Sequence, residues 1–362
     1  MSRKAIITVT NDLISDQRAH KVAETLLSYG YKVLLVGRKT TNNKSPLRNY
    51  ETKRFSLLFN KGFLFYANYN IRLFFFLIFR RYDLIWAVDL DSLLPGYLLG
   101  RLKKKELIYD AHELFTEVPE LAGRPLVKGV WTKIEQRILP KLKHVVTVSE
   151  LIANHFSKKY KINALVLRNF PFAQQEQTVY TPEKKTIIYQ GSINKNRGLE
   201  ELVMAMINLE DTSLIIVGDG DEFANIRELI KKNKLMDSVQ LIGRVPFEDL
   251  PDWTRKGTLG VSIEKAEGSM SYAYALPNKV FDYIKFGVPV LVSGELTELV
   301  ELVNHYKIGE TVSPISSDAL ATAISNLFND PSKLMNYSNN CLLAHEDLNW
   351  EKEVEKIKDL II

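Results

Sequence analysis

Strand-like and helix-like segments alternate along almost the whole chain of 362 residues. The strand-like segments are short runs rich in Val, Ile and Leu, and most segments between them repeat apolar residues at helical spacing. This alternation predicts parallel sheets that helices cover on both faces. Two similar sets of strands therefore indicate an α/β fold with two doubly wound, Rossmann-like domains. The predicted strands are residues 5–10, 32–38, 84–89, 106–111, 144–149 and 164–169, and then 186–191, 213–218, 239–243, 259–264, 289–293 and 309–313. The predicted helices are residues 15–29, 90–104, 125–141, 150–160, 199–209, 222–233, 247–255, 278–286 and 298–305.

A polar stretch without a strand or helix pattern, residues 171–185, separates the two sets and is the expected linker. We expect an N-terminal domain at residues 1–170 and a C-terminal domain at residues 186–345. Residues 346–362 have the pattern of a last helix with a single apolar stripe. The stripe consists of Trp350, Val354, Ile357 and Ile361. Because such a stripe needs a groove, we expect this helix to cross back to the N-terminal domain.

The composition predicts a cytoplasmic protein, soluble or peripherally attached to a membrane. Cys341 is the only cysteine, which excludes an intramolecular disulfide and fits a reducing compartment. The first residues run straight into a predicted strand without a long apolar region, so we expect no signal peptide. The longest apolar run, residues 73–79, is far shorter than the roughly 20 residues that span a bilayer.

Charge is divided unevenly along the chain. Residues 1–172 hold 29 Lys and Arg against 14 Asp and Glu, a net charge of +15, whereas residues 173–362 hold 19 against 29, a net charge of −10. Such a basic half indicates an anionic ligand or surface, and unevenly distributed solvated charge is the alternative. Only this charge suggests nucleic acid, which we do not expect as a partner.

Residues 59–82 form an aromatic and aliphatic segment with cations near both ends. These cations are Lys53, Arg54, Lys61, Arg72, Arg80 and Arg81. Basic residues that border an apolar helix suit the interface of an anionic membrane. A core helix of the N-terminal domain explains the pattern equally well.

Loops of the second half carry glycines and a cation where predicted strands end, and ligands bind at the carboxyl ends of strands in parallel sheets. Gly191 and Gly198 would allow close approach of a ligand, and Arg197 would supply a charge for an anion before the next helix. A second glycine turn contains Gly218 and Gly220. A tight turn alone explains each pattern, but together they predict a site for a phosphorylated ligand.

A short predicted helix, residues 278–286, carries a cation and a carboxylate. At helical spacing Lys279 and Asp282 share a face, which is not simply the face packed on the core. The two residues either belong to a ligand site or form an intrahelical pair on a solvated face, worth a few tenths of a kcal/mol.

The sequence motifs resemble a known family. The series YQGSINKNRGLEELVMAM, LIIVGDG, LIGRVP and LPNKVFDYIKFGVPVLVS is similar to the nucleotide-sugar domain of glycosyltransferase family 4 (group 1), retaining enzymes of the GT-B fold. The first half, with ITVTNDLISDQRAHKVAETLLSYGYKVLLVGR, IYDAHELF, TVSE and VLRNFP, is similar to the acceptor domain of bacterial members that build surface polysaccharides. The resemblance covers nearly the whole chain, and it implies two parallel sheets that face each other across a cleft.

The resemblance also implies roles for individual residues. Asp282, five residues before the glycine of the G-x-P-V motif, would bind the ribose of the nucleotide. Arg197 would bind the diphosphate with help from Lys279, and both cations would stabilise the leaving group. The remaining residues implied at the donor site are Gly191, Ser192, Gly218, Gly220, Tyr274, Leu276 and Asn278.

Two positions depart from the family pattern. The family has two glutamates separated by seven residues, whereas this chain has Asp282 in the second position and Tyr274 in the first. Because the usual first carboxylate contacts the transferred sugar, the identity of the sugar is open, and Glu264 or Glu267 could substitute. Ser192 stands where the family often has an arginine.

On the N-terminal side the resemblance implies a sugar-contacting or catalytic histidine, here His112, which follows a predicted strand. A histidine that only caps a helix is the alternative. Asp110 or Glu113 could orient its ring. Asp16, Arg18 and Glu113 are the acceptor-side residues, although Asp16 and Arg18 also suit a plain helix start.

The pair Asp89 and Asp91 resembles the Asp-x-Asp motif that binds a divalent cation in the other large glycosyltransferase fold. That fold lacks two repeated strand–helix halves, so we expect no metal and no cofactor besides the donor. Arg197, Lys279 and helix dipoles would balance the diphosphate instead.

These observations predict a metal-independent retaining glycosyltransferase with a UDP- or GDP-type sugar donor. The expected acceptor is a lipid-linked molecule or a glycan of cell-surface polysaccharide biosynthesis, and the expected location is the inner face of the cell membrane. Two alternatives remain: a nucleotide-sugar 2-epimerase of the same fold, and a non-catalytic nucleotide-sugar-binding adaptor, which Tyr274 suggests.

Overall fold

The computed structural model describes residues 2–14, 16–40, 48–118, 121, 123–173, 180–181 and 183–361. The chain divides into two compact units. Unit 1 comprises residues 1–169 together with 354–362, and unit 2 comprises residues 170–353. The expected linker lies at the start of unit 2, and its residues 174–179 and 182 lie outside the described residues.

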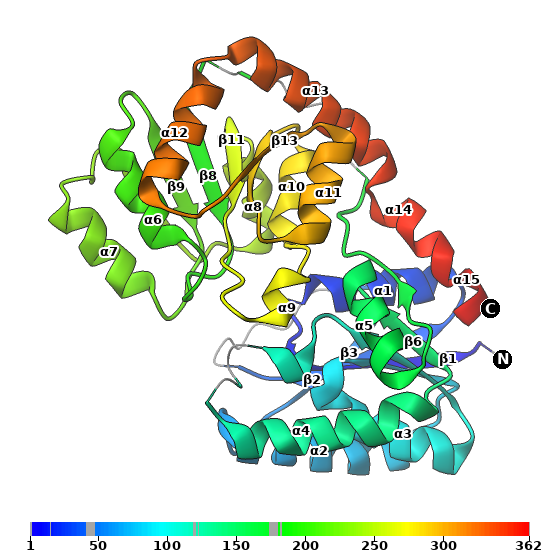
Figure 1. Cartoon of the computed structure of the whole chain (residues 1–362). Coiled ribbons are helices and arrows are strands. Elements are labelled where there is room, and N and C mark those ends of the chain that lie inside the picture. The colour runs from blue at the N-terminus through cyan, green and yellow to red at the C-terminus, as the bar shows by residue number, and fades with distance from the viewer. Residues whose placement is uncertain are drawn as a thin grey trace. The chain divides into compact units, whose positions relative to one another are not determined.

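Unit 1 is built on a seven-stranded sheet with the order β3-β2-β1-β4-β5-β6-β7, in which all neighbours are parallel. Figure 1 shows α1 and α5 on one face of this sheet and α2, α3 and α4 on the other. The strands are β1 (Lys4–Asp12), β2 (Lys32–Arg38), β3 (Glu51–Phe55), β4 (Leu84–Val88), β5 (Glu106–Ala111), β6 (His144–Thr147) and β7 (Leu165–Val166). The helices are α1 (Gln17–Ser28), α2 (Gly62–Ile78), α3 (Asp89–Lys103), α4 (Pro125–Ile138) and α5 (Glu150–Tyr160), with 3-10 turns at η1 (Phe115–Glu117) and η3 (Leu139–Lys141).

Unit 2 repeats the architecture with a six-stranded parallel sheet in the order β10-β9-β8-β11-β12-β13. Its strands are β8 (Thr186–Gln190), β9 (Ser213–Val217), β10 (Val239–Gly243), β11 (Leu259–Ser262), β12 (Val290–Ser293) and β13 (Gly309–Val312). Its helices are α6 (Leu199–Ala205), α7 (Phe223–Lys232), α8 (Leu250–Thr254), α9 (Met270–Ala273), α10 (Asn278–Lys285), α11 (Thr297–Tyr306), α12 (Ser317–Phe328), α13 (Pro331–Asp347) and α14 (Trp350–Glu353), with 3-10 turns at η4 (Met206–Asn208) and η5 (Phe247–Asp249).

The predicted α/β class with two parallel sheets is confirmed, and one strand was missed. β3 pairs with β2 at the edge of its sheet and consists of the polar run ETKRF. An edge strand has one free side, so it needs no continuous run of apolar residues and its sequence carries a weak strand signal.

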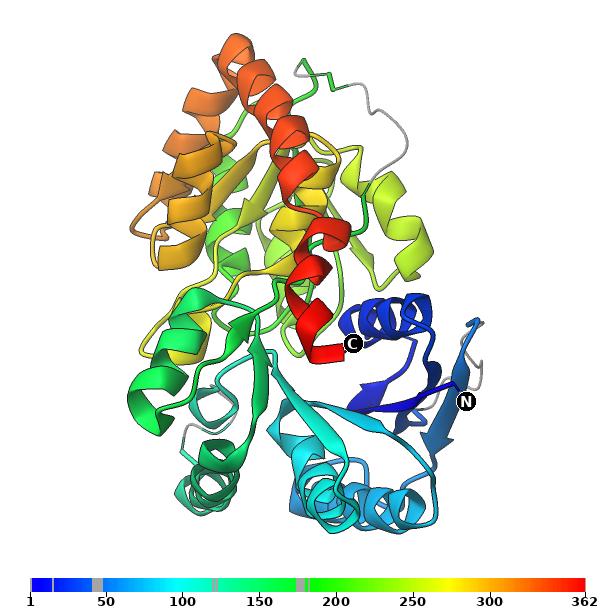
Figure 2. The same ribbon diagram turned by 90° about the vertical axis from the view of Figure 1, so that its right-hand side faces the viewer.

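The end of the chain belongs to unit 1 and lies beside α1 in Figure 2. It consists of η6 (Val354–Ile357) and α15 (Lys358–Ile361). Of the predicted apolar stripe, Trp350, Ile357 and Ile361 are buried. The side chains of Arg3 and Tyr31 donate hydrogen bonds to the carbonyl oxygen of Ile361, at 3.1 and 2.9 Å. These bonds tie the last turn to the start of the first domain.

The cores of both units combine aliphatic and aromatic side chains, with strand residues of almost zero exposure such as Ile7 and Ile188 and buried rings such as Trp86 and Tyr283. Cys341 of α13 is a free, buried thiol that faces the carbonyl oxygens of Val288 and Ile308, and burial raises its pKa well above the ordinary value. In the described chain no helix is both long and apolar enough to cross a membrane.

Candidate active site

The glycine turns of unit 2 lie at the carboxyl ends of β8 and β9, where two loops pack against each other through their backbones. A Cβ atom on Gly218 would lie 1.8 Å from the carbonyl oxygen of Gly191, and one on Gly220 would lie 2.4 Å from that of Ile193. Gly191 itself has a φ of 130°, which side chains rarely adopt. Packing of the fold therefore explains these glycines, and the ligand signal of this region has to come from its side chains.

A buried carboxylate joins the two cations of unit 2 that the sequence singled out. Glu264, which follows β11, is 2% exposed. Its Oε1 lies 2.7 Å from Lys279 Nζ and 3.3 Å from Arg197 Nη1, and its Oε2 accepts a hydrogen bond of 2.7 Å from the hydroxyl of Ser262. The cluster of Arg197, Glu264 and Lys279 holds two cations against one carboxylate, so it carries a positive excess.

The pKa shifts follow from this arrangement. Burial alone would raise the pKa of Glu264, but Lys279 and Arg197 outweigh it and lower the pKa to about 2. For Lys279 burial dominates and lowers the pKa in spite of Glu264, while Arg197 adds to the lowering. An incoming anion would favour the charged form of Lys279 in the same way that Glu264 does.

Aromatic rings support both cations. Arg197 lies over the ring of Tyr272 at 4.9 Å, and Lys279 lies over the ring of Tyr189 at 3.9 Å. The hydroxyl of Tyr189 donates to the carbonyl oxygen of Ser192 at 2.8 Å, which fixes the ring beneath Lys279. Cations held over aromatic faces are attracted by the ring quadrupole, so the two charges are kept in place without full neutralisation.

The residues predicted on and before α10 fall into distinct environments. Lys279 is 8% exposed and pairs with Glu264, so the helix face that it occupies is not a solvated one. Asp282 is half-buried and Asn278 is exposed. Leu276 packs in the core with Val280 and Phe281. Of the other residues predicted at the donor site, Tyr274 is half-buried at the end of α9, and Ser192 is exposed.

A cavity of about 300 Å³ lies beside Arg197, between the loop before α6 and the segment after β11. Glu267 lines it, whereas Glu264 is buried in its ion pairs. Of the two glutamates that could substitute for Tyr274, Glu267 is therefore the one with a carboxylate at an open cavity.

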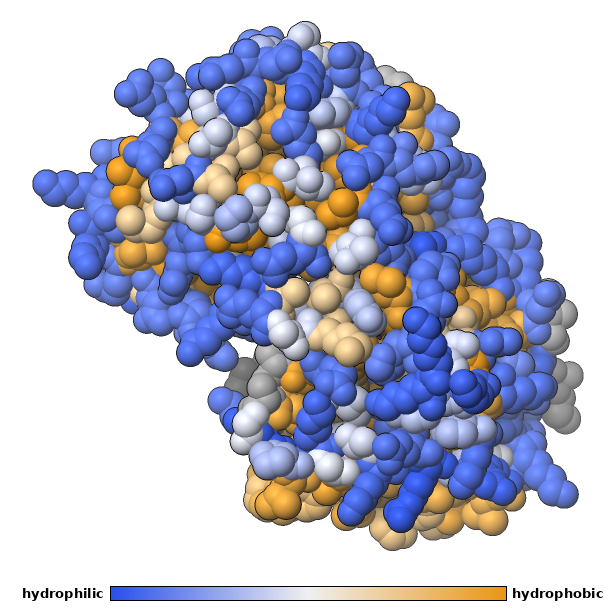
Figure 3. Space-filling view, viewed as in Figure 1, coloured by the Kyte–Doolittle hydropathy of each residue, from blue (hydrophilic) through white to orange (hydrophobic). Residues whose placement is uncertain are grey.

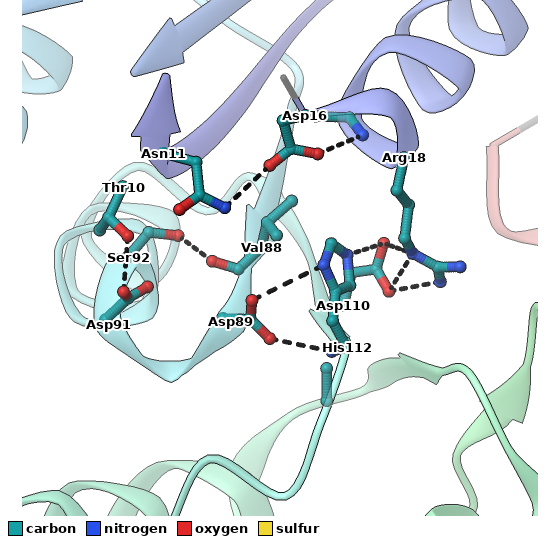
Figure 4. Close-up of polar contacts among 12 residues, drawn as sticks. Thr10, Asn11, Asp16, Arg18, Val88, Asp89, Asp91, Ser92, Asp110 and His112 are labelled. Atoms are coloured by element: carbon teal, nitrogen blue, oxygen red, sulfur yellow. Dashed lines mark hydrogen bonds and ion pairs between the residues drawn. The ribbon is translucent and has the colours of Figure 1, made fainter. Parts of the chain in front are cut away.

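In unit 1 the predicted histidine lies in a partly buried network at the ends of β4 and β5, drawn in Figure 4. His112 Nδ1 lies 3.6 Å from Asp89 Oδ2, and its Nε2 lies 3.5 Å from Asp110 Oδ2. The backbone N–H of His112 also donates to Asp89 Oδ1 at 2.9 Å. The contact from Nε2 to Asp110 is too long for a strong hydrogen bond, so this ring N–H is held only weakly.

Asp110 is completely buried, and besides His112 two side chains contact it. Arg18 donates to its two oxygens through Nε and Nη2 at distances of 2.6 to 3.2 Å, and Trp86 Nε1 donates at 3.0 Å. Arg18 is 2% exposed and also donates to the carbonyl oxygen of Leu167 at 2.7 Å. The guanidinium of Arg18, which was predicted on the acceptor side, therefore holds the carboxylate of Asp110 in place.

Ion pairing with two carboxylates raises the pKa of His112. Burial would lower its pKa, but Asp89 and Asp110 outweigh burial and raise the pKa to about 9. Burial alone would raise the pKa of Asp110, but Arg18 and then His112 hold it well below its ordinary value. At neutral pH the ring is therefore a cation that can donate through both nitrogens.

The other acceptor-side residues have separate positions. Asp16 is the N-cap of α1: its Oδ1 accepts from the N–H of Ala19 at 3.0 Å and its Oδ2 from Asn11 at 3.2 Å. This is the geometry of the plain helix start that the sequence also allowed. Glu113 lines a cavity beside α2.

The two carboxylates of the Asp-x-Asp motif contact different side chains. Asp89 faces His112, whereas Asp91 accepts a hydrogen bond of 2.6 Å from Thr10. Across the described ranges no group of three or more His, Cys, Asp or Glu side chains has the geometry to hold a metal. Asp89 also has a φ of 55°, a left-handed conformation that costs about 1–2 kcal/mol in a residue with a side chain. Such strain is retained where contacts such as those to His112 offset it.

Sequence reasoning missed two residues of these clusters. Glu264 was considered only as a sugar ligand, and Asp89 only as part of a metal motif, although they are the ion-pair partners of the predicted cations and histidine. One signal was available for Asp89: β4 and β5 are neighbours, so the residues after them lie at one sheet edge.

Family models match the sequences of both units. Residues 172–341 match the family model described as "Glycosyl transferases group 1", and residues 16–169 match the one described as "Glycosyltransferase Family 4". An uncharacterized glycosyltransferase of Haemophilus influenzae is 22% identical over 355 residues, which is 94% of either chain.

Solved structures share the fold along the full chain. A sucrose-phosphate synthase from Thermosynechococcus elongatus superposes with a TM-score of 0.82 at 20% identity, over 99% of this chain and 98% of that one. Anabaena Alr3699/HepE, solved in complex with UDP and glucose, superposes with a TM-score of 0.76 at 16% identity, over 99% of both chains. At these identities the likeness concerns the fold alone.

Proposed function

Because the chain belongs to the group 1 glycosyltransferases, which have two Rossmann-like domains in the GT-B fold, we propose that it transfers a sugar from a nucleoside-diphosphate sugar to a glycan or lipid-linked acceptor. The donor would be of the UDP or GDP type, and the sugar would be transferred with retention of configuration. The resemblance of both halves to bacterial enzymes that build surface polysaccharides motivates the proposed pathway class.

The observation that carries the proposal is the positive excess of the cluster of Arg197, Glu264 and Lys279. The cluster lies at the ends of β8 and β11, where the strand order of the six-stranded sheet reverses. Ligands of doubly wound sheets bind at such switch points. A diphosphate that contacts Arg197 and Lys279 would gain charge stabilisation as the bond to the sugar breaks, which favours departure of the nucleoside diphosphate. The carboxylate of Asp282 would accept hydrogen bonds from the ribose hydroxyls.

His112 would act on the sugar. Its Nε2 lies 3.5 Å from Asp110 Oδ2, so this ion pair is long and a closer oxygen would accept the N–H more strongly, and its cationic form suits stabilisation of an oxygen that becomes negative. Asp89 and Asp110 would orient the ring, and Arg18 would keep Asp110 ionised. We further propose that the diphosphate charge is balanced by Arg197 and Lys279 and that no metal ion takes part.

Peripheral contact with an anionic membrane is part of the proposal. Figure 3 shows apolar side chains gathered along the edge formed by α2, α3 and α4. We name this the α2–α4 surface. Its exposed apolar residues are Phe63, Leu64, Ile71, Phe75, Phe79, Leu98, Leu102, Leu126 and Val130. The exposed cations on and beside these helices include Lys61, Arg72, Arg80, Arg81, Arg101, Lys104, Lys105, Arg124, Lys133 and Arg137.

The acidic residues of the three helices, Asp89, Asp91 and Glu135, are not exposed. Beside the helices, Asp83 and Glu106 pair with Lys105 and Lys143, and Glu117 pairs with Lys128 of α4. The α2–α4 surface therefore offers apolar side chains and an excess of positive charge. This combination favours the headgroup region of an anionic bilayer, and it supports a location on the inner face of the cell membrane.

Calorimetric titration with UDP, GDP, ADP and CDP tests the donor site. We expect saturable binding of one nucleotide, weakened at least tenfold by Asp282→Ala and by Arg197→Ala, which corresponds to about 1.4 kcal/mol each. Matched controls are Asp237→Ala and Arg227→Ala, two exposed positions of the same unit, which should leave the affinity unchanged.

Turnover of the corresponding nucleotide sugar then separates the function classes. Acceptor-dependent release of nucleoside diphosphate supports the transferase. An epimerised sugar in the absence of acceptor would indicate a 2-epimerase, and donor binding without any release would indicate the adaptor. Lack of binding by all four nucleotides would overturn the proposed function.

A further inference from the structure

A cavity of about 430 Å³ opens at the carboxyl ends of the strands in unit 1, beside the first turn of α2. Its walls include residues at the ends of β1 and β2 and residues after β4 and β5. The order of the seven-stranded sheet reverses between β1 and β4, so the cavity lies at the switch point where doubly wound sheets bind ligands. Its volume falls within the range of small-molecule sites.

Asp91 is the buried acceptor of this cavity. It is 7% exposed, and its Oδ2 accepts the hydrogen bond from Thr10. Its Oδ1 has no hydrogen-bond partner in the described ranges. A buried carboxylate oxygen without a donor is costly, so a ligand hydroxyl that donated to it would remove that cost. Burial and the neighbouring Asp89 also raise the pKa of Asp91 to about 7, as expected for a carboxyl that lacks a full set of partners.

Cations, aromatic rings and two further carboxylates, those of Asp89 and Glu113, line the same cavity. Arg38 ends β2, its guanidinium lies over the ring of Phe65 at 4.8 Å, and its buried Nε is without a hydrogen-bond partner among the described residues. Lys61 is exposed immediately before α2. Tyr66 and Phe115 add two rings, each held edge-on by Trp131. An anionic group suits the two cations, and rigid rings offer apolar area to the face of a sugar.

We propose that this cavity binds a sugar phosphate, with a sugar hydroxyl on Asp91 and the phosphate at Arg38 and Lys61. The proposal rests on the proposed function, of which it identifies the acceptor class. α2 begins at Gly62 in the cavity wall and continues through exposed Phe63 and Leu64 into the α2–α4 surface. The phosphate therefore lies at the start of an apolar surface, and the acceptor is the lipid-linked form, with its tail along α2.

Binding of five probes to the full chain tests the proposal: inorganic phosphate, glucose 1-phosphate, N-acetylglucosamine 1-phosphate and the octyl phosphodiester of each of these two sugar phosphates. We expect the sugar phosphates to bind more tightly than inorganic phosphate and the octyl esters to bind more tightly still. Asp91→Asn and Arg38→Gln should each weaken the sugar phosphates at least tenfold. Asp83→Asn and Arg101→Gln, outside the cavity on the same unit, are the matched controls.

The outcomes separate this proposal from the donor site. If no sugar phosphate binds, or if Asp91→Asn and Arg38→Gln leave binding unchanged in folded protein, the cavity is not an acceptor site. If the octyl esters bind no better than the free sugar phosphates, the lipid-linked form is overturned. In both cases the titrations with nucleotides stand, because they report on unit 2. Arg38 is half-exposed, so Arg38→Gln keeps the test available if Asp91→Asn fails to fold.

Discussion

The polar clusters of the two units are built from similar groups but differ in their charge balance. In unit 1 the cations Arg18 and His112 face the carboxylates of Asp89 and Asp110. In unit 2 two cations share the single carboxylate of Glu264. The first cluster is balanced and the second has a positive excess. The difference suits a polar sugar or hydroxyl in unit 1 and a diphosphate in unit 2.

This balance is the reverse of what the net charges of the two halves suggest. The first half carries +15, yet its buried cluster is neutral, and the second half carries −10, yet its cluster is positive. The surplus cations of the first half include those of the α2–α4 surface. Net charge therefore reports on the solvated surface of a domain, and a buried site has to be assessed from its own contacts.

The clusters also differ in how the backbone supports them. Close contacts between glycine-containing loops position the residues of unit 2, whereas unit 1 uses side-chain hydrogen bonds and a strained Asp89. Substitutions should consequently act through different mechanisms in the two units.

The largest expected effect distinguishes a balanced cluster from one with a surplus cation. Arg18→Met leaves the carboxylate of Asp110 buried without its main partner, and we expect the free energy of unfolding to fall by about 3–5 kcal/mol. Lys279→Met should cost less, about 1–3 kcal/mol, because Arg197 stays beside Glu264. Urea midpoints and slopes measure both. Equal losses would contradict the difference in charge balance.

A smaller effect tests the glycine packing of unit 2. Gly198 and Gly30 have similar φ values of 71° and 82°, but a Cβ on Gly198 would lie 2.3 Å from the carbonyl oxygen of Ile263, while Gly30 has no atom of the described chain within 4 Å. Gly30→Ala should cost about 1–2 kcal/mol of strain. Gly198→Ala should cost about 1–3 kcal/mol more because of overpacking. The same denaturation measurement checks this, and matching losses would show that the loop yields to the added methyl group.

The pH dependence of stability should contain an alkaline component from unit 1. The pKa of His112 is raised to about 9 in the folded protein, so its stabilising contribution is complete below its ordinary value near 6.5 and is lost as the pH rises through 9. The stability difference between the unmodified protein and His112→Asn should shrink by on the order of 2 kcal/mol between pH 6 and pH 10. His144→Asn is the control, because burial lowers the pKa of His144. A constant difference over this range would mean that His112 is not held as a cation.

The smallest effect on stability concerns the α2–α4 surface. Phe79 is 84% exposed, so Phe79→Ser should change the free energy of unfolding by less than about 0.5 kcal/mol. It should nevertheless reduce co-sedimentation with vesicles that contain anionic lipid. Met236→Ser, at a 60% exposed apolar position of unit 2, is the matched control and should have no effect on sedimentation. Similar behaviour of the two variants would argue against membrane contact through α2.

Local patterns of the sequence were enough to predict much of the architecture. Runs of Val, Ile and Leu marked the central strands, since strands buried on both faces must be apolar throughout. Helical spacing and the residues before Gly287 placed Lys279 and Asp282 on a short helix at a sheet edge, and the stripe at Trp350, Ile357 and Ile361 is largely buried as its spacing requires. Edge strand β3 was not predicted, because a strand with a free side needs no such apolar run.

Only the tertiary structure decided which charged groups meet. Arg18 and Asp110 are 92 residues apart in the chain, and Arg197 and Glu264 are 67 apart. No local sequence pattern predicts either pair. The order of the strands in the sheet brings the two loops together, and no single segment of the sequence determines that order. The sequence determined which segments become strands and helices, since these depend on neighbours a few residues away. The partner of each buried charge depends on long-range packing, which decides burial, pKa and the sign of each cluster.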